Sequence, residues 1–103
     1  MYWKAGGFGL PLNQSVTFKT VLQRQGRFQV PKIVRWQFKL EPTEVLQVTV
    51  SVVDLVSAQE TFFARMLKDG RIVVPKLTLA LLKGDEPSLE GCALEVTLEP
   101  ARR

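Results

Sequence analysis

Two arginines, Arg27 and Arg71, hold the same place in two copies of a short motif. Residues 26–32 read Gly-Arg-Phe-Gln-Val-Pro-Lys, and residues 70–76, which begin 44 positions later, repeat five of the seven. Arginine presents a planar fork of N–H donors that matches phosphate oxygens and the guanine edge. The motif therefore predicts either a surface that binds a polyanion or two arginines that brace their own turns.

Other chemistry is limited by what the sequence lacks. The chain has no histidine and a single cysteine, Cys92, which removes Ser-His-Asp and Cys-His catalysis and the usual zinc sites. The glycine-rich stretch at residues 6–9 does not precede a predicted helix, so it is a poor phosphate cradle. Asp85, Glu86 and Glu90 are interpreted as a solvated loop. We therefore predict a non-catalytic domain without a cofactor or a metal.

The positive charge is unevenly distributed along the chain. The net charge is +4, and residues 1–56 hold seven Lys or Arg against three Asp or Glu, whereas residues 57–103 hold seven of each. Such asymmetry is typical of a basic face that meets a polyanion, although a solvated surface has the same composition. The predicted DNA-binding residues are Lys19, Arg24, Arg27, Lys32, Arg35, Lys39 and Arg71.

The elements that must position these residues also occur twice. Residues 15–22 alternate as a half-buried strand, and a turn and a short strand lead to Pro31, which suits the first turn of a helix. We expect helices over 32–39 and 76–83, each with an apolar stripe toward the core. The stripe residues are Ile33, Val34, Phe38 and Leu40 in the first helix, and Leu77, Leu79, Leu81 and Leu82 in the second.

A final strand completes each copy. Residues 46–52 alternate, and 94–98 repeat their pattern at an offset of 48, so the second copy carries a four-residue insertion near 84–87. We assign one domain with repeats at 15–54 and 59–99 and an N-terminal arm at 1–14. A copy of about 40 residues rarely folds alone. The predicted fold is therefore mainly β: one small closed barrel built from two pseudo-twofold strand–strand–short helix–strand repeats.

This pattern resembles the SpoVT/AbrB family, the swapped-hairpin barrels of bacterial and archaeal transcription regulators and antitoxins. The resemblance covers residues 16–52 and 60–98. Two copies in one chain resemble the tandem MraZ proteins or the single-chain archaeal barrels of the RIFT type. The chain is short for MraZ and lacks that family's Asp-x-x-x-Arg signature after Pro-Lys. The resemblance thus favours a monomeric, single-chain barrel.

The resemblance also implies a function. In that family, DNA is contacted by the arginine of Gly-Arg and by arginines of the following helix, which match Arg27, Arg71 and Arg35 here. The second helix carries Leu79 and Ala80 at the matching places, so half of the basic helix face is missing. The resemblance implies a DNA-binding, transcription-regulator-like domain that binds weakly and electrostatically.

The alternative is a protein-interaction or structural module without DNA binding. Trp3, Phe8 and Trp36 would then form an exposed apolar patch for a protein partner. Burial tendencies favour a different place for Trp36, packed between its helix and the barrel. No apolar run approaches the ~20 residues that span a bilayer, and no secretory signal is recognised, so we expect a cytoplasmic protein with no membrane partner.

Overall fold

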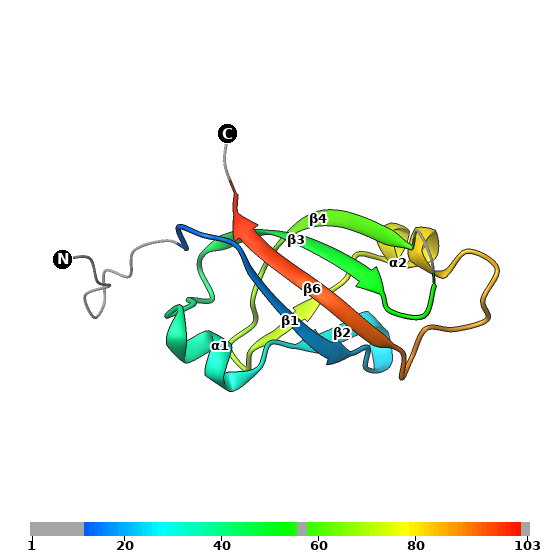
Figure 1. Ribbon diagram of the computed structural model, residues 1–103, viewed down its shortest axis with the longest axis horizontal. Coiled ribbons are helices and arrows are strands. Elements are labelled where there is room, and N and C mark those ends of the chain that lie inside the picture. The colour runs from blue at the N-terminus through cyan, green and yellow to red at the C-terminus, as the bar shows by residue number, and fades with distance from the viewer. Residues whose placement is uncertain (1–11, 56–57, 102–103) are drawn as a thin grey trace.

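The computed structural model describes residues 12–55 and 58–101. Six strands and two short helices follow one another in the order in which the two repeats predict them (Figure 1). The elements are β1 (Val16–Val21), the 3-10 turn η1 (Arg24–Gly26), β2 (Arg27–Gln29), α1 (Lys32–Gln37), β3 (Val45–Val52), β4 (Gln59–Arg65), β5 (Arg71–Val73), α2 (Lys76–Lys83) and β6 (Ala93–Pro100).

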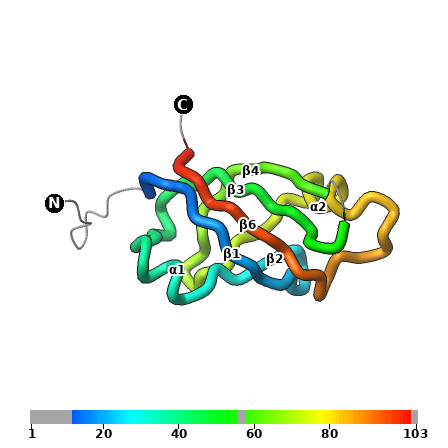
Figure 2. Tube along the Cα trace, viewed as in Figure 1, coloured from blue at the N-terminus to red at the C-terminus, as the bar shows by residue number. Residues whose placement is uncertain are grey.

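The strands form two antiparallel sheets. One sheet has four strands in the order β1-β6-β3-β4, and the other is a two-stranded ribbon of β2 and β5. The tube trace shows the last strand, β6, running between β1 and β3 (Figure 2). The predicted mainly-β class is confirmed. No helix in the described part of the chain is long and apolar enough to cross a membrane.

The first strand of each repeat pairs with the last strand of the other repeat. β1 pairs with β6, the last strand of the second repeat, and β4 pairs with β3, the last strand of the first. Phe18 lies opposite Val96 and Phe62 lies opposite Val48, so the two pairings become one another when the repeats are exchanged. In the ribbon, Phe28 lies opposite its own counterpart, Ile72. The backbone therefore follows the repeat in the sequence.

The buried side chains of the two repeats form one hydrophobic cluster. Phe28 and Ile72 of the ribbon are fully buried in it, as are Leu46 and Val96 of the four-stranded sheet. Leu12, near the end of the predicted N-terminal arm, also belongs to the cluster, whereas the first eleven residues of that arm lie outside the described residues. Alternation along the strands supplies this core, because every second side chain points inward.

Besides the shared core, individual hydrogen bonds link the strands outside the two ladders. Val30 N–H donates to Gly70 O and Val74 N–H donates to Gly26 O, at 2.9 and 2.8 Å, and these bonds extend the β2–β5 ribbon at its two ends. The Thr20 hydroxyl donates to the carbonyl of Gln29 at 3.1 Å. Among the described residues the ladders of the two sheets do not join into one continuous sheet. The closed barrel therefore stays a prediction.

The two helices lie at opposite ends of the molecule (Figure 1). The expectation that their apolar stripes face the core is wrong in part, because the side chains of Ile33 and Leu77 are each 72% exposed and Leu81 is also exposed. Leu40 and Leu82 are buried, and Val34, Phe38 and Leu79 pack against the core from its edge. A helix of two turns at the end of a sheet rests on one flank only, so the other flank faces solvent.

Candidate nucleic-acid interface

The outer face of the β2–β5 ribbon carries both motif arginines. Because side chains alternate along a strand, the burial of Phe28 and Ile72 turns their neighbours outward. Arg27 lies opposite Val73 and Arg71 lies opposite Gln29. The two arginines are thus diagonal neighbours, which lie about 7–8 Å apart in an ordinary ladder. The ribbon therefore presents two guanidinium groups on one small surface.

Each arginine contacts the side chain two residues before it, within its own turn. The Nη2 of Arg27 donates to the Oε1 of Gln25 at 2.9 Å. The Nε of Arg71 lies 3.5 Å from the Oδ2 of Asp69, the residue that corresponds to Gln25. Both Nε atoms are buried without a hydrogen-bond partner among the described residues. The arginines thus touch their own turns and do not contact an acidic group of the other repeat.

The two turns differ in charge. Asp69 partly neutralises Arg71, whereas the partner of Arg27 is an uncharged amide. Both contacts are solvent-exposed, so each contributes less than about 1 kcal/mol to stability. The difference matters more for a ligand, because a phosphate would meet an uncompensated cation at Arg27 and a compensated one at Arg71.

Arg35 extends from α1 across the turn of the second repeat. Its Nε donates to Val30 O at 3.2 Å, and a Cβ added to Gly70 would lie 2.6 Å from its Cζ. Gly70 has a φ of +88°, a conformation that favours glycine. Leu79, the counterpart of Arg35, lies over Gly26 in the same way, with a Cβ on Gly26 falling 3.0 Å from its Cδ2. Arg35 is therefore placed beside the ribbon and next to the turn of Arg71.

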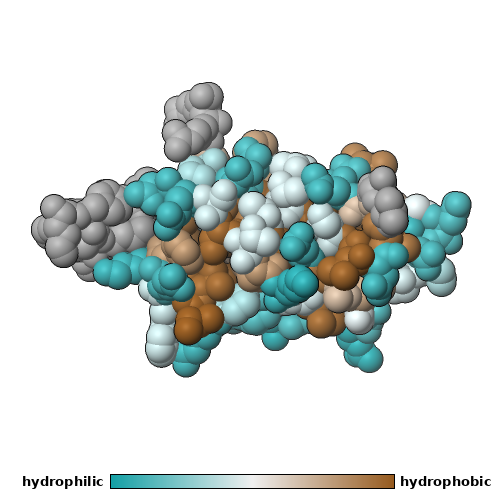
Figure 3. All heavy atoms as spheres, viewed as in Figure 1, coloured by the Kyte–Doolittle hydropathy of each residue, from teal (hydrophilic) through white to brown (hydrophobic). Residues whose placement is uncertain are grey.

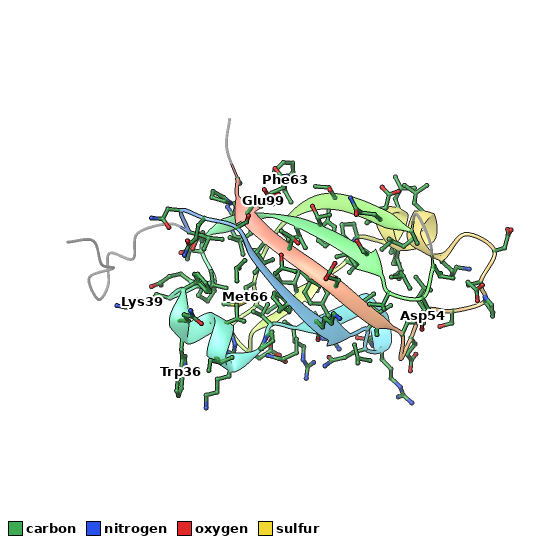
Figure 4. The ribbon with its side chains drawn as sticks, in the orientation of Figure 1. Trp36, Lys39, Asp54, Phe63, Met66 and Glu99 are labelled. Carbon is green, nitrogen blue, oxygen red and sulfur yellow. The ribbon has the colours of Figure 1, made fainter. Side chains whose placement is uncertain are left out.

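Trp36 projects from α1 away from the rest of the molecule (Figure 4). The prediction that it packs between helix and barrel is wrong, because its side chain is 69% exposed. The ammonium of Lys32, one helical turn earlier, lies 4.8 Å from the ring centroid, within the range of a cation–π contact. Lys39 follows the end of the helix. Trp3 and Phe8, the other residues of the predicted apolar patch, lie outside the described residues.

Three of the predicted residues are not part of this surface: Lys39, which follows the end of α1, and Lys19 and Arg24. Lys19 is in the four-stranded sheet, in register with Glu95 on β6. Arg24 has a side chain that is 88% exposed, and its Nε lies 3.9 Å from a carboxylate oxygen of Glu90. Lys19 and Arg24 are therefore each accompanied by an acidic residue. The structure groups Arg27, Lys32, Arg35 and Arg71 on the ribbon and α1, and we call these four residues the basic surface.

Charge separates by element across the fold. The elements η1, β2, α1, β5 and α2 contain seven Lys or Arg residues and no Asp or Glu. The strands of the four-stranded sheet contain two cations, Lys19 and Arg65, and three acids, Glu60, Glu95 and Glu99. The side of the molecule in Figure 3 mixes hydrophilic and hydrophobic atoms, with an exposed hydrophobic region over α1. The ribbon and helices are thus the basic elements.

A pocket of about 610 Å³ opens beside α2. Its walls include Leu79 and Ala80 of the helix, the turn before β2, and the loop at 87–90, which follows the predicted insertion. At the matching place in the first repeat, the larger Arg35 and Trp36 stand in the positions of Leu79 and Ala80. Sequence reasoning missed both this pocket and the contact of Arg35 with Gly70, although the insertion and the Arg–Leu difference were visible in the repeat.

Comparison with known proteins gives a fold and no family. No family model matches the chain. No curated protein matches it either. The solution structure of PHS018 from Pyrococcus horikoshii superposes on 84% of this chain and 95% of its own length, with a TM-score of 0.66 and 23% sequence identity. This similarity shows a shared fold alone.

Proposed function

We propose that this domain binds DNA through the basic surface, as a non-catalytic, transcription-regulator-like domain of the AbrB type. The observation that carries the proposal is the separation of charge: η1, β2, β5 and the two helices contain seven cations and no acid, and four of the seven form the basic surface. Oriented cations that reach phosphate oxygens supply most of the affinity of a protein for a polyanion. Arginine on an exposed ribbon can also reach base edges in a groove.

The fold proposed for this function is a closed swapped-hairpin barrel. Support comes from the exchange of first strands between repeats and from the hydrogen bond that Thr20 of β1 donates to the carbonyl of Gln29 on β2. In such a barrel the ribbon closes one side of the core and is therefore a rigid platform. Arg27 and Arg71 would then project from backbone that is fixed by the core beneath it.

Binding through four cations is expected to be weak and strongly dependent on salt. Each phosphate neutralised on duplex DNA contributes about −0.9 to the slope of log K against log salt, so the basic surface gives a slope of roughly −3 to −4. The first repeat should contribute most of the affinity for DNA. Among the described residues, Arg27 and Arg35 have no carboxylate partner, whereas Arg71 has one. The bound duplex should therefore lie across β2 and α1.

An NMR titration with a short duplex at low salt tests this proposal. Backbone shifts should concentrate at Arg27, Arg35 and the ribbon, and they should disappear as salt is raised. Arg65 provides the matched control, since it is a cation of the four-stranded sheet whose substitution to Ala should leave the affinity unchanged. Shifts absent from Arg27 and Arg35, or an equal loss of affinity in Arg65→Ala, would contradict the proposal.

A second candidate, a protein-binding surface around Trp36, is favoured by the exposure of that side chain and of Ile33. It predicts association that is insensitive to salt and lost in a Trp36→Ser, Ile33→Ser double variant. Sedimentation of the chain alone at increasing concentration tests one form of it, an interface between copies. DNA binding that survives this double variant would show that the two surfaces are separate.

A further inference from the structure

We infer that Trp36 is a stacking platform for an unpaired nucleobase, so that α1 binds single-stranded nucleic acid in addition to the backbone contacts of the basic surface. This inference rests on the proposed nucleic-acid function and names the form of nucleic acid that α1 selects. The shared chemistry is an unpaired base on a phosphate backbone, which DNA and RNA both provide.

The first observation is that the indole ring of Trp36 is exposed and is contacted by Lys32. A tryptophan side chain that is 69% exposed on a helix with no buried residue contributes little to the fold. The ammonium of Lys32 lies over the ring at 4.8 Å from its centroid. No aromatic ring of the described residues stacks on it, since the one aromatic pair among them is Phe18 with Phe28. The ring is therefore contacted by a cation, and most of the side chain is exposed to solvent.

The second observation is the position of the cations around the ring. Lys32, Arg35 and Trp36 stand at positions i, i+3 and i+4 of α1, so they share one face of the helix. Arg35 uses its Nε for Val30 O, and no further hydrogen bond of its guanidinium is found in the described part of the chain. A base stacked on Trp36 would thus have two phosphate-binding groups on the same helix, Lys32 over the ring and Arg35 toward the ribbon. Base–aromatic stacking contributes about 1–3 kcal/mol per base.

The same geometry discriminates against a duplex. Bases in a duplex are stacked and paired, so their faces are not available to Trp36 except at an end. Duplex DNA would be held by the cations alone, whereas a single strand would gain the stacking contact as well. Trp36 should therefore increase the affinity for single strands and leave the affinity for duplex DNA unchanged.

A protein partner fits this surface less well. An apolar partner packed on Trp36 would bury the ammonium of Lys32, and a buried charge without a carboxylate partner is costly. Lysine is depleted in the cores of protein interfaces for this reason. A phosphate backbone keeps that ammonium paired with an opposite charge while the base covers the ring.

The second repeat shows which residues create the platform. Ala80 occupies the place of Trp36 and Leu77 that of Ile33, so α2 has the lysine of the first turn, Lys76, without an aromatic ring. α2 therefore serves as an internal control: it has the same position in the fold and an exposed apolar surface, and it should not stack a base. The nucleic acid should meet one end of the molecule only.

The experiment uses the full chain with Trp3→Phe, so that Trp36 is the single tryptophan fluorophore. Oligo(dT), oligo(U), a DNA hairpin duplex and inorganic polyphosphate are titrated at low salt. We expect both single strands to quench the fluorescence of Trp36, and the duplex and polyphosphate to leave it nearly unchanged.

Variants of Trp36 test the same contact through the affinity, which is measured by the anisotropy of a labelled single strand. Trp36→Leu should weaken single-strand binding about 5- to 100-fold, and Trp36→Phe should retain most of the affinity. Leu81→Ala, an exposed apolar substitution on α2, is the matched control and should change nothing.

The outcomes separate this inference from the proposed function. If Trp36→Leu leaves the affinity for both single strands unchanged, or if polyphosphate quenches as strongly as oligo(dT), the stacking inference is overturned while duplex binding through Arg27 and Arg35 stands. If none of the polymers binds, both proposals fail. If Trp36→Leu changes only the self-association of the chain, Trp36 belongs to a protein interface and the inference is again overturned.

Discussion

The two repeats of this chain cover equivalent turn glycines with different side chains. Each repeat places a helix residue over the turn glycine of the other, Arg35 over Gly70 in one case and Leu79 over Gly26 in the other. The hydrogen bonds from Val30 and Val74 to those same turns are equivalent as well. The backbone has thus kept its twofold relation where the surface chemistry has not.

This difference shows that two segments with equivalent strand pairing can carry different surface side chains. Residues 24–39 carry five cations and no acid, whereas the matching residues 68–83 carry four cations and one acid, Asp69. Ala80, which lines the pocket beside α2, stands in the second repeat where the first repeat has the exposed ring of Trp36. A symmetric basic face would suit a palindromic duplex; a one-sided face suits a ligand that meets one repeat.

The largest expected effect tests whether the repeats share one core. Phe28→Ala should lower the free energy of unfolding by about 3–5 kcal/mol, because the fully buried ring leaves a cavity, and Ile72→Ala should lower it by about 2–5 kcal/mol. Urea denaturation of both variants should show a single transition. Two separate transitions, or a loss confined to one repeat, would mean that the repeats are independent units.

The turn glycines give the next largest effect. Gly26→Ala and Gly70→Ala should each cost about 1–2 kcal/mol of stability, because both residues have positive φ. Gly70→Ala should also weaken DNA binding, since its methyl group would displace the guanidinium of Arg35. Thermal unfolding and anisotropy with a labelled duplex measure the two quantities. Equal DNA affinity in the two variants would remove Arg35 from the interface.

Arg27→Ala and Arg71→Ala compare the ribbon arginines directly. Arg27→Ala should weaken duplex binding more, and it should reduce the salt slope by about 0.9, because its charge has no described carboxylate partner. Both variants should change stability by less than about 1 kcal/mol, since the turn contacts are exposed. A loss of stability without a loss of affinity would identify these arginines as structural.

The smallest expected effect comes from exchanging the partners of the two arginines. Asp69→Asn should raise DNA affinity about 2- to 5-fold by releasing the charge of Arg71, and Gln25→Glu should lower it by a similar factor, consistent with the ~0.2–1 kcal/mol of an exposed ion pair. The Oδ1 of Asp69 accepts a hydrogen bond from the backbone N–H of Arg71. Asparagine keeps a side-chain oxygen that can accept the same bond. If both variants raise the DNA affinity, or both lower it, the charge of the turn residue does not explain the difference between Arg27 and Arg71.

The repeat in the sequence predicted the strands well because alternation and the two prolines mark where each strand lies and stops. Helix α2 spans the predicted residues, and the three-residue β2 and β5 end before Pro31 and Pro75. The exposed flanks of the helices were not predictable in the same way. An apolar stripe such as that of Ile33 and Phe38 shows that a helix is amphipathic, but its packing depends on how much of the helix rests on the sheet.

The candidate site was predictable only where its contacts are local. The contacts of Arg27 with Gln25 and of Arg71 with Asp69 span two residues, so inspection of each turn suffices. The contact of Arg35 with Gly70 depends on the exchange of strands between repeats, which composition and periodicity do not specify. The exposure of Trp36 likewise follows from the place of α1 at the end of the fold.

The exchange of first strands has a consequence for the order of the chain itself. Val16 of β1 lies opposite Leu98 of β6, just as Phe62 and its neighbours on β4 lie opposite β3. A circular permutant that links β6 to β1 through a short loop and is opened between β3 and β4 would therefore run through the same series of elements, with the basic repeat now second. Such a rearranged chain should reach the same topology, because the pairing of the strands does not depend on which repeat is synthesised first.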